Sequence, residues 1–515
     1  MKNLYIAAML LVAGALTSCD MDLERAGAIG TDNGIQTKAD CQKFLNGIYS
    51  GLRSSTAGEY IAVPEFQADM FQATVVNGNN YGDFAFGTVT AATSEIEDQF
   101  YGTYNHIANI NFFLPRAQAL VDADALPEAD IAEVDMMIGV AKFARAYYNT
   151  FLFDRYCQAY SEEKAETPAL GIPIVDEYNP TPERGSYPGR SSMRETVNFI
   201  NADLDDAYSR LKSYEENVSK AACAPNAYTI SSYAVEALQA RVALLTADYD
   251  TAIAKAEDVI NSGIYTLCMS ADYSKMWLND ASTELIYVPY GSKEEAGAVP
   301  ATGGVWLYSN AKNTSYFIPS SEAIAQYAAR DIRGTVFFDE YGIVCNGEEV
   351  DAPVFNKFPG NPEIWTTTSN NLKNKPKPFR LSELYLIAAE SYDMKGDATN
   401  ANKYVNELRM RRISLYLPQN MSGNTLTEAI RTERCKELLG EGFRLSDLKR
   451  WGVGFTRTCQ YGEIDSWYDG VGETLLYPRS RTLSYSAGDY RYVWPIPQAE
   501  MEVNPQLKGQ QNPGY

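Results

Sequence analysis

The chain has one histidine and a shortage of basic charge. His106 is the single histidine in 515 residues, which gives no basis for a histidine-based catalytic triad or a multi-histidine metal site. We expect it to be a packed helix residue. The 44 lysine and arginine residues face 66 aspartate and glutamate residues, so the formal net charge is −22. This balance argues against nucleic acid as a partner and against direct electrostatic attraction to anionic lipid.

Cysteine motifs and cofactor fingerprints are also missing. The 8 cysteines include no CxxC pair and are irregularly spaced, so they predict neither a disulfide framework nor a zinc site. No phosphate loop, dinucleotide fingerprint or EF-hand loop occurs. We therefore expect no cofactor and no metal. So many acidic residues always allow a carboxylate pair for glycoside hydrolysis, but no motif singles one out.

The first 36 residues have the features of an export and anchoring segment. Residues 1–18 combine a positive start at Lys2 with an apolar run, residues 4–16, that is too short to span a bilayer. Small residues lead directly into Cys19, a pattern similar to the bacterial lipoprotein box, in which the cysteine is lipidated. Residues 19–36 then have the composition of a polar tether. We expect a membrane anchor through lipid alone; the alternative is an ordinary secretory signal with an incidental cysteine.

Apolar residues at spacings of three and four predict a mainly α chain. The pattern is clearest in two helices, Leu381–Tyr392 and Ala398–Arg412, which form a hairpin closed by Gly396 and capped by Asp397. A third helix is expected to begin at Thr425, which opens a capping box.

An internal repeat links this hairpin to an earlier one. If Asp248 is placed on Asp397, small residues align where the two arms of each hairpin cross, as tetratricopeptide-like pairs require. The aligned pairs are Ala240 with Ala389, Ala243 with Tyr392, and Ala252 with Ala401. The predicted fold is therefore mainly α, a tetratricopeptide-like scaffold of helical hairpins with loop-rich insertions and a few short strands.

The predicted organisation has two helical regions, each interrupted by loops. Residues 37–261 form the N-terminal region, with a loop-rich insert at 59–93. Residues 262–515 form the C-terminal region. It comprises a loop-rich, aromatic segment (262–378), the helices of 379–451, and an irregular tail (452–515).

Three motifs in the second region resemble the SusD/RagB family. They are Asn406–Arg412, Glu433–Arg444 with Asp447–Trp451, and the closing Trp494-Pro-Ile-Pro497 with its Asn-Pro tail. Members of this family are surface glycan-binding lipoproteins of Bacteroidetes. The resemblance implies a protein of the cell outer membrane that captures an oligosaccharide and delivers it to a TonB-dependent, SusC-like transporter. We interpret the charged motif residues as structural ion pairs and caps.

Ligand contacts in such proteins lie in variable loops, so motif matching assigns none of them. Sugar binding needs aromatic rings for the apolar sugar faces and amide or charged groups for the hydroxyls. Loop-rich segments with this composition suggest six ligand-binding candidates, namely Asn79, Asn80, Tyr81, Trp306, Tyr308 and Trp365. For Tyr81 the alternative is a hydrophobic anchor that holds its loop.

Two other functions stay open. The RagB branch of the family suggests a peptide ligand, which aromatic loops with acidic neighbours would also suit. A surface glycosidase is the third possibility, and the absence of a recognisable acid/base motif argues against it.

Overall fold

The computed structural model describes residues 34–123, 126–309, 314–345, 348–458 and 482–515. The predicted signal segment, Cys19 and most of the predicted tether lie outside these ranges. Within them, no helix combines the length and the apolar character needed to cross a membrane.

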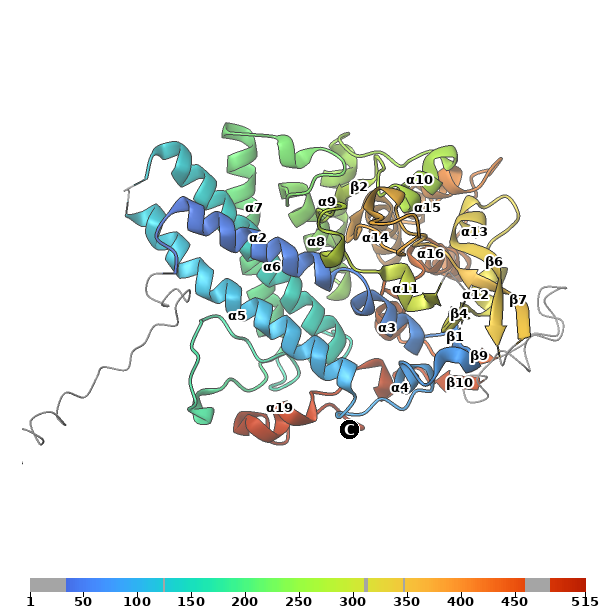
Figure 1. The fold of residues 1–515 in the computed structure, drawn as a ribbon, viewed down its shortest axis with the longest axis horizontal. Coiled ribbons are helices and arrows are strands. Elements are labelled where there is room, and N and C mark those ends of the chain that lie inside the picture. The colour runs from blue at the N-terminus through green and yellow to red at the C-terminus, as the bar shows by residue number, and fades with distance from the viewer. Residues whose placement is uncertain (1–33, 124–125, 310–313, 346–347, 459–481) are drawn as a thin grey trace, which may run out of the picture.

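Helices packed in chain order form the N-terminal half. They are α2 (Lys38–Ser55), α5 (Ser94–Asp122), α6 (Glu128–Tyr156), α7 (Met193–Asn217), α8 (Ser232–Leu245) and α9 (Tyr249–Asn261). From α5 to α9 each helix packs against the next, while α2 lies against α5 and α6 (Figure 1). Each helix can bury an apolar stripe on its neighbour in this arrangement, which explains the periodicity of the sequence.

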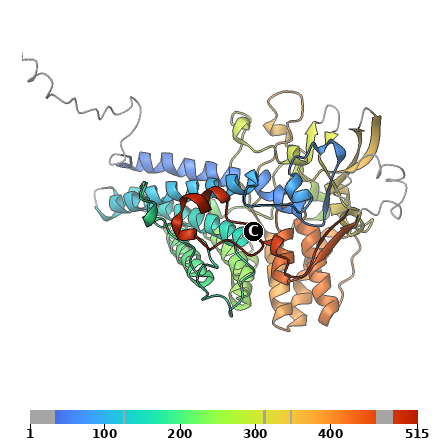
Figure 2. The ribbon, with the colours of Figure 1, turned by 90° about the horizontal axis from the view of Figure 1, so that it is seen from below.

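The C-terminal helices extend the same array. They are α14 (Leu381–Met394), α15 (Ala398–Arg412), α16 (Gly423–Leu438) and α17 (Arg444–Trp451). Because α14 packs against α9, the two halves are joined through a continuous helical core. Seen from below, α14–α16 (orange) and the green helices project from the same side of the molecule, and α2 and α5 lie above the green helices (Figure 2).

The hairpins α8–α9 and α14–α15 turn in the same way. Ala247 and Gly396 precede the second helix of each hairpin in left-handed conformations, with φ of 57° and 78°. The next residue in each, Asp248 or Asp397, caps the second helix with its side chain. Its backbone N–H bonds back into the first helix at aligned positions, to Ala243 O and Tyr392 O, both at 2.9 Å. The shared turn supports the alignment of the two hairpins.

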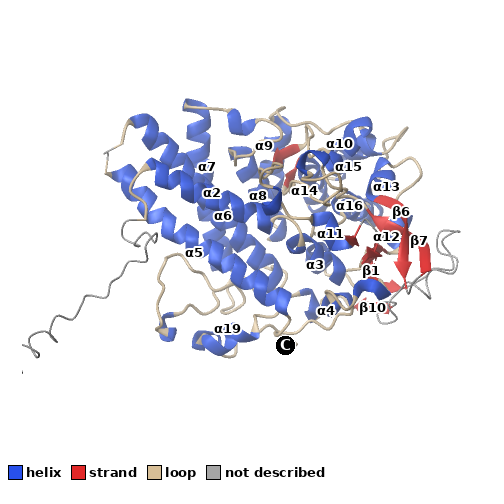
Figure 3. Cartoon of the chain, in the orientation of Figure 1, coloured by secondary structure: helices blue, strands red, loops and turns tan. Residues whose placement is uncertain are grey.

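Short strands and helices cover one end of the array (Figure 3). The described strands form antiparallel pairs: β1 (Phe71–Ala73) with β5 (Phe317–Pro319), β2 (Leu285–Tyr287) with β8 (Phe379–Arg380), β3 (Leu307–Ser309) with β4 (Thr314–Ser315), β6 (Phe338–Cys345) with β7 (Glu348–Phe355), and β9 (Phe455–Thr458) with β10 (Thr482–Tyr485). The short helices among and beside them are α3 (Glu59–Gln67), α4 (Gly82–Ala85), α10 (Tyr273–Leu278), α11 (Thr302–Trp306), α12 (Ser321–Ala325), α13 (Ile332–Phe337) and α19 (Gln498–Val503). The mainly α fold with a few short strands is thus confirmed.

Helix α3 was not predicted. It opens the 59–93 segment, which we expected to be loop-rich, and its residues from Ala62 to Gln67 are all buried. A short helix that is buried almost all round shows no amphipathic stripe, and Pro64 inside it suggests a break rather than a helix.

The prediction of a capping box at Thr425 was also wrong. Helix α16 begins at Gly423 after Ser422, and no side chain caps its first turn. Thr425 lies inside the helix. The mistake follows from a pattern that any Thr-x-x-Glu sequence satisfies, because the box needs an extended N-cap residue that the sequence does not reveal.

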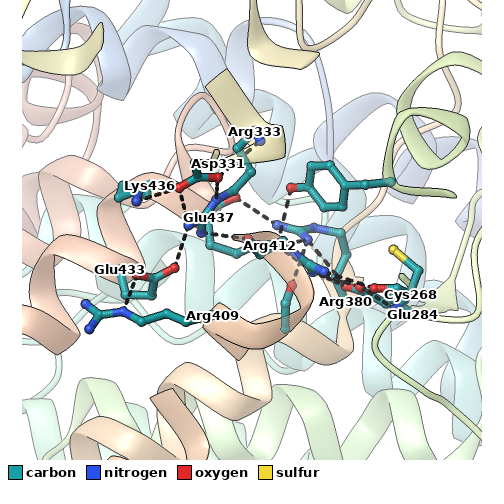
Figure 4. A network of polar contacts seen from close by, with 12 residues as sticks. Cys268, Glu284, Asp331, Arg333, Arg380, Arg409, Arg412, Glu433, Lys436 and Glu437 are labelled. Carbon is teal, nitrogen blue, oxygen red and sulfur yellow. Dashed lines mark hydrogen bonds and ion pairs between the residues drawn. The ribbon is translucent and has the colours of Figure 1, made fainter. Parts of the chain in front are cut away.

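A buried ionic network joins α15 and α16 to the loop-rich segment (Figure 4). Glu437 accepts hydrogen bonds from Arg412 Nε at 3.0 Å, Arg380 Nη1 at 2.9 Å and Arg333 Nη1 at 3.1 Å. Arg412 also donates to both carboxylate oxygens of Glu284. Burial alone would raise the pKa of Glu437, but the surrounding guanidinium groups hold it well below its usual range. The structural interpretation of this motif is confirmed, since these side chains are almost completely enclosed.

Candidate functional site

Trp306 cannot offer a ring face to a ligand in this structure. Its side chain is completely buried at the end of α11. The ring centroid lies 5.0 Å from that of Phe355, 5.6 Å from Phe66 and 5.7 Å from Phe358. The prediction of a binding role was wrong because composition does not separate an exposed tryptophan from a core one. Gly303 in the same short helix is a further sign of close packing here, since a Cβ at that position would clash with the Phe358 carbonyl.

The 79–81 loop is at the surface, but its aromatic ring is partly used by the fold. Asn79 and Asn80 are exposed, whereas Tyr81 is half-buried. The Tyr81 hydroxyl donates to Glu59 Oε1 at 2.7 Å, and its ring centroid is 5.6 Å from that of Phe66. Tyr81 therefore anchors its loop to α3, which is the alternative role considered for it. The exposed amides stay candidates for ligand contacts.

The two remaining candidates are less informative. Trp365 is half-buried directly after the 3₁₀ turn Pro362–Ile364, and its indole N–H has no hydrogen-bond partner among the described residues. Tyr308 belongs to β3, and its side chain lies outside the described part of the chain. Their role in binding stays a prediction.

A cleft with an exposed aromatic pair lies elsewhere, beside α2 and α7. Its volume is about 680 Å³, and residues 219–230 and 290–295 complete its walls. Tyr228 and Tyr290 are 46% and 48% exposed, and their ring centroids are 5.3 Å apart in an edge-to-face arrangement. Two nearly half-exposed rings in mutual contact form a rigid aromatic surface with faces left for a ligand.

Buried contacts hold the Tyr290 side of the cleft. Arg53 of α2 is largely buried, and its Nη1 donates to Tyr290 O and to Glu295 Oε2, both at 2.8 Å. The guanidinium thus joins the loop that carries Tyr290 to the helical array. Because two acceptors are fixed by one planar donor group, the ring position is well defined.

The Tyr228 side is held by backbone bonds to β2. Asn226 N–H donates to Leu285 O, and Val288 N–H donates to Ala227 O, both at 2.9 Å. Lys375 Nζ lies 5.2 Å from the Tyr228 ring centroid, within the range of a cation–π contact.

Polar groups line the same cleft as the aromatic pair. Gln42 and Asn46 project from exposed positions of α2 into the lining of the cleft, and Gln42 Nε2 donates to Asn46 Oδ1 at 3.0 Å. Amides can both donate and accept, so they suit a ligand with many hydroxyl groups. The arrangement offers adsorption of a polar, ring-shaped ligand and provides no obvious nucleophile.

Sequence reasoning missed this pair although a signal was present. Both tyrosines stand in aperiodic segments, next to Pro289 and Gly291 in one case and after Asn226 in the other. The same composition had directed attention to Tyr81. What the sequence did not reveal is that β2 brings segments about sixty residues apart together.

The single histidine packs against a tyrosine of the next helix. His106 stacks on Tyr148 with ring centroids 4.9 Å apart, and burial lowers its pKa. This agrees with a packed helix residue. Across the described ranges, no three histidine, cysteine or acidic side chains converge in a way that could hold a metal ion.

Comparisons with known proteins identify the family. The model of the SusD family matches residues 339–515, and a model described as starch-binding and associating with the outer membrane matches residues 29–244. The chain belongs to the SusD/RagB family. It is therefore a member of a family of sugar-binding proteins associated with the outer membrane.

Individual relatives cover nearly the whole chain. SusD-like protein P25 of Formosa agariphila is 23% identical over 98% of both chains. A SusD superfamily protein of Bacteroides thetaiotaomicron is 25% identical, with a TM-score of 0.74 over 93% of this chain and 100% of the other. A SusD-like carbohydrate-binding protein of Bacteroides vulgatus shares the fold at 18% identity, with a TM-score of 0.71 over 93% of this chain and 98% of the other. At these identities the scaffold is shared, whereas ligand contacts have to be argued from this chain.

Proposed function

We propose that this protein is a lipid-anchored surface receptor that captures an oligosaccharide in the Tyr228–Tyr290 cleft. The exposed tyrosine pair is the observation that carries the proposal. Pyranose rings have apolar faces that stack on aromatic rings, and exposed amides at the rim can take up the hydroxyls. The family, whose members bind sugars at the outer membrane, supports the same conclusion.

The expected affinity is modest. Two stacked rings contribute about 1 kcal/mol each beyond area burial. With a few net hydrogen bonds of about 1 kcal/mol each, the sum corresponds to a Kd on the order of millimolar to micromolar. Such affinity suits a receptor that must release its ligand to a transporter.

Transfer to a TonB-dependent, SusC-like barrel completes the proposed role. A lipid on Cys19 would hold the protein at the membrane, and residues 19–36 would provide reach. A Cys19→Ala variant is expected to leave the membrane fraction and to lose copurification with the barrel. Retention of the variant in membranes would contradict lipid anchoring at this residue.

The capture role can be tested by calorimetry on the chain from Asp20 onward against neutral and acidic oligosaccharides. We expect a saturable signal with one glycan class that falls at least tenfold in Tyr228→Ala or Tyr290→Ala. Tyr490→Ala is the matched control, because Tyr490 is 46% exposed and packs edge-on against Tyr515 outside the cleft.

Other results would change the conclusion. If glycan binding is unchanged in both cleft variants, the site lies elsewhere, and Asn79, Asn80 and Trp365 would be the next residues to replace. No calorimetric signal with glycans, together with a saturable signal with peptides, would favour the RagB-like alternative. Release of reducing ends would identify a glycosidase.

A further inference from the structure

A second pocket, separate from the tyrosine cleft, lies between α5, the 173–188 segment and α19. Its volume is about 430 Å³, and it shares no lining residue with the cleft. Tyr101, Tyr104 and Tyr187 contribute aromatic rings, and Asp176, Glu177 and Glu500 contribute carboxylates. The residues that line it include no lysine and no arginine.

Hydrogen bonds build the aromatic walls. The Tyr104 hydroxyl donates to Pro173 O at 2.7 Å, and the Tyr187 hydroxyl donates to Thr181 O at 3.0 Å. Both hydroxyls are thereby turned to the backbone, which fixes the orientation of the rings. The walls are thus preformed, so a ligand would not have to order them.

The segment that carries the acidic residues Asp176 and Glu177 is fixed by hydrogen bonds from two buried side chains. Arg145 Nη1 donates to Asp176 O at 3.3 Å, and Asn111 Nδ2 donates to Val175 O at 2.9 Å. With its carbonyls directed inward, the segment leaves Asp176 and the adjacent Glu177 exposed.

Glu500 of α19 contributes a further negative charge to the pocket lining. It accepts a hydrogen bond from Asn504 Nδ2 at 3.2 Å, and no lysine or arginine within the described ranges forms an ion pair with it. Glu500 and Tyr101 line the same pocket, and burial, followed by the charges of Glu500 and Glu97, raises the pKa of Tyr101 to about 12.

The buried cations near the pocket are already occupied. Arg145 is paired with Asp203, and the guanidinium of Arg190 donates to Gly171 O at 2.8 Å, to Gln510 O at 3.0 Å and to Asn512 Oδ1 at 2.8 Å. They therefore do not neutralise the carboxylates at the mouth of the pocket.

We propose that this pocket binds an organic ammonium group carried by a ligand, such as the amine of an amino sugar or of a lysine side chain. Tyrosine faces attract such a cation through their quadrupoles, and the carboxylates complement its charge. A metal ion fits less well, because it needs carboxylates that converge, and no such group occurs in the described part of the chain. The volume lies in the range of small-ligand sites.

Matched pairs of probes test this assignment by calorimetry on the chain from Asp20 onward. One pair is the glucosamine trimer and its N-acetylated counterpart, and the other is Nα-acetyl-lysine methylamide and its norleucine analogue. We expect at least one amine to bind tenfold or more tightly than its neutral partner. The preferred pair identifies the source of the ammonium group.

Two variants of α19 locate the binding. Glu500→Gln is expected to weaken amine binding at least tenfold. Glu502→Gln is the control, because Glu502 lies on the same helix, is exposed and bonds only Gln498 among the described residues. It should leave the affinity within about twofold. Equal melting temperatures would show that neither variant disturbs the fold.

Three outcomes would overturn the proposal. They are equal binding of charged and neutral probes, equal losses in Glu500→Gln and Glu502→Gln, and displacement of the amine by micromolar calcium. The second would indicate only the general attraction of an acidic protein. None of them affects the tyrosine cleft, so glycan capture would stand or fall separately.

Discussion

The ionic network around Glu437 and the Tyr228–Tyr290 cleft use side chains in opposite ways. In the network, charged groups are enclosed and bonded to one another. In the cleft, two aromatic rings are nearly half exposed and touch each other edge to face. One region has no surface left for a ligand, whereas the other leaves ring faces in water.

This difference separates the scaffold from the variable function. Two of the network residues, Arg412 and Glu437, come from the motifs that resemble the family, and the network joins helices to loops (Figure 4). The two tyrosines of the cleft come from loops outside those motifs. We therefore expect changes in the network to alter stability, and changes in the cleft to alter binding alone.

Replacing Glu437 should produce the largest effect. Glu437→Gln removes the one countercharge that contacts Arg333, Arg380 and Arg412 together among the described residues, and breaking such a buried network costs about 3–5 kcal/mol of unfolding free energy. Urea denaturation followed by circular dichroism measures the loss. Glu428→Gln is the control, since the ion pair that Glu428 forms within the described ranges is an exposed one with Arg431, and its loss should change stability by less than about 0.5 kcal/mol. A loss below 1 kcal/mol for Glu437→Gln would show that the network does not stabilise the fold.

Glu65 should show the opposite pH dependence to the ion-paired carboxylates of the network. Burial raises its pKa from 4.5 to about 7, although Gly442 N–H donates to its Oε1 at 2.8 Å. The unfolded carboxyl ionises first, so the native state loses stability as pH rises from about 4.5 to 7. Between pH 5 and pH 8, Glu65→Gln should gain about 2 kcal/mol relative to the natural protein. If the unfolding free energies of Glu65→Gln and the natural protein change with pH in the same way, the pKa of Glu65 is not raised by burial.

The network carboxylates behave in the opposite sense. The pKa of Glu437 is depressed, so its stabilisation is present above pH 4.5 and is lost as pH falls. One series of unfolding measurements at different pH values can show both effects. The contribution of Glu437 changes below pH 4.5, whereas that of Glu65 changes between about pH 4.5 and 7.

A change at Tyr228 should affect binding and leave stability almost unchanged. Tyr228→Phe keeps the ring and should stay within about threefold of the natural affinity. Tyr228→Leu removes the aromatic face and should weaken glycan binding about tenfold, or ~1.4 kcal/mol. Calorimetry and thermal melting measure the two quantities. Equal binding by the two variants would mean that stacking is not the main contact.

The sequence predicted the scaffold better than the site. Helical periodicity, the Gly396 turn and the Asp397 cap are local patterns, and the structure forms them as expected. The resemblance of the motifs to the family is likewise confirmed. Local rules failed at α3, where burial on all sides removes the periodic signal.

Binding surfaces depend on information that is not local. Trp306 and Tyr290 both lie in glycine-containing, aperiodic segments, yet one is completely buried and the other is 48% exposed. The difference arises from Phe66 and Phe355, which enclose Trp306 from distant parts of the chain. Composition alone cannot supply these contacts.

The smallest expected effect concerns the paired hairpin turns. Ala247 and Gly396 hold equivalent left-handed positions, so only one of them carries a strained Cβ. Gly396→Ala should lower the unfolding free energy by about 1 kcal/mol, whereas Ala247→Gly should raise it or leave it unchanged. Because both turns lie in the helical array, neither change should alter glycan affinity. A change in affinity without a change in stability would contradict the separation of scaffold from cleft, since it would mean that the hairpins position the binding surface directly.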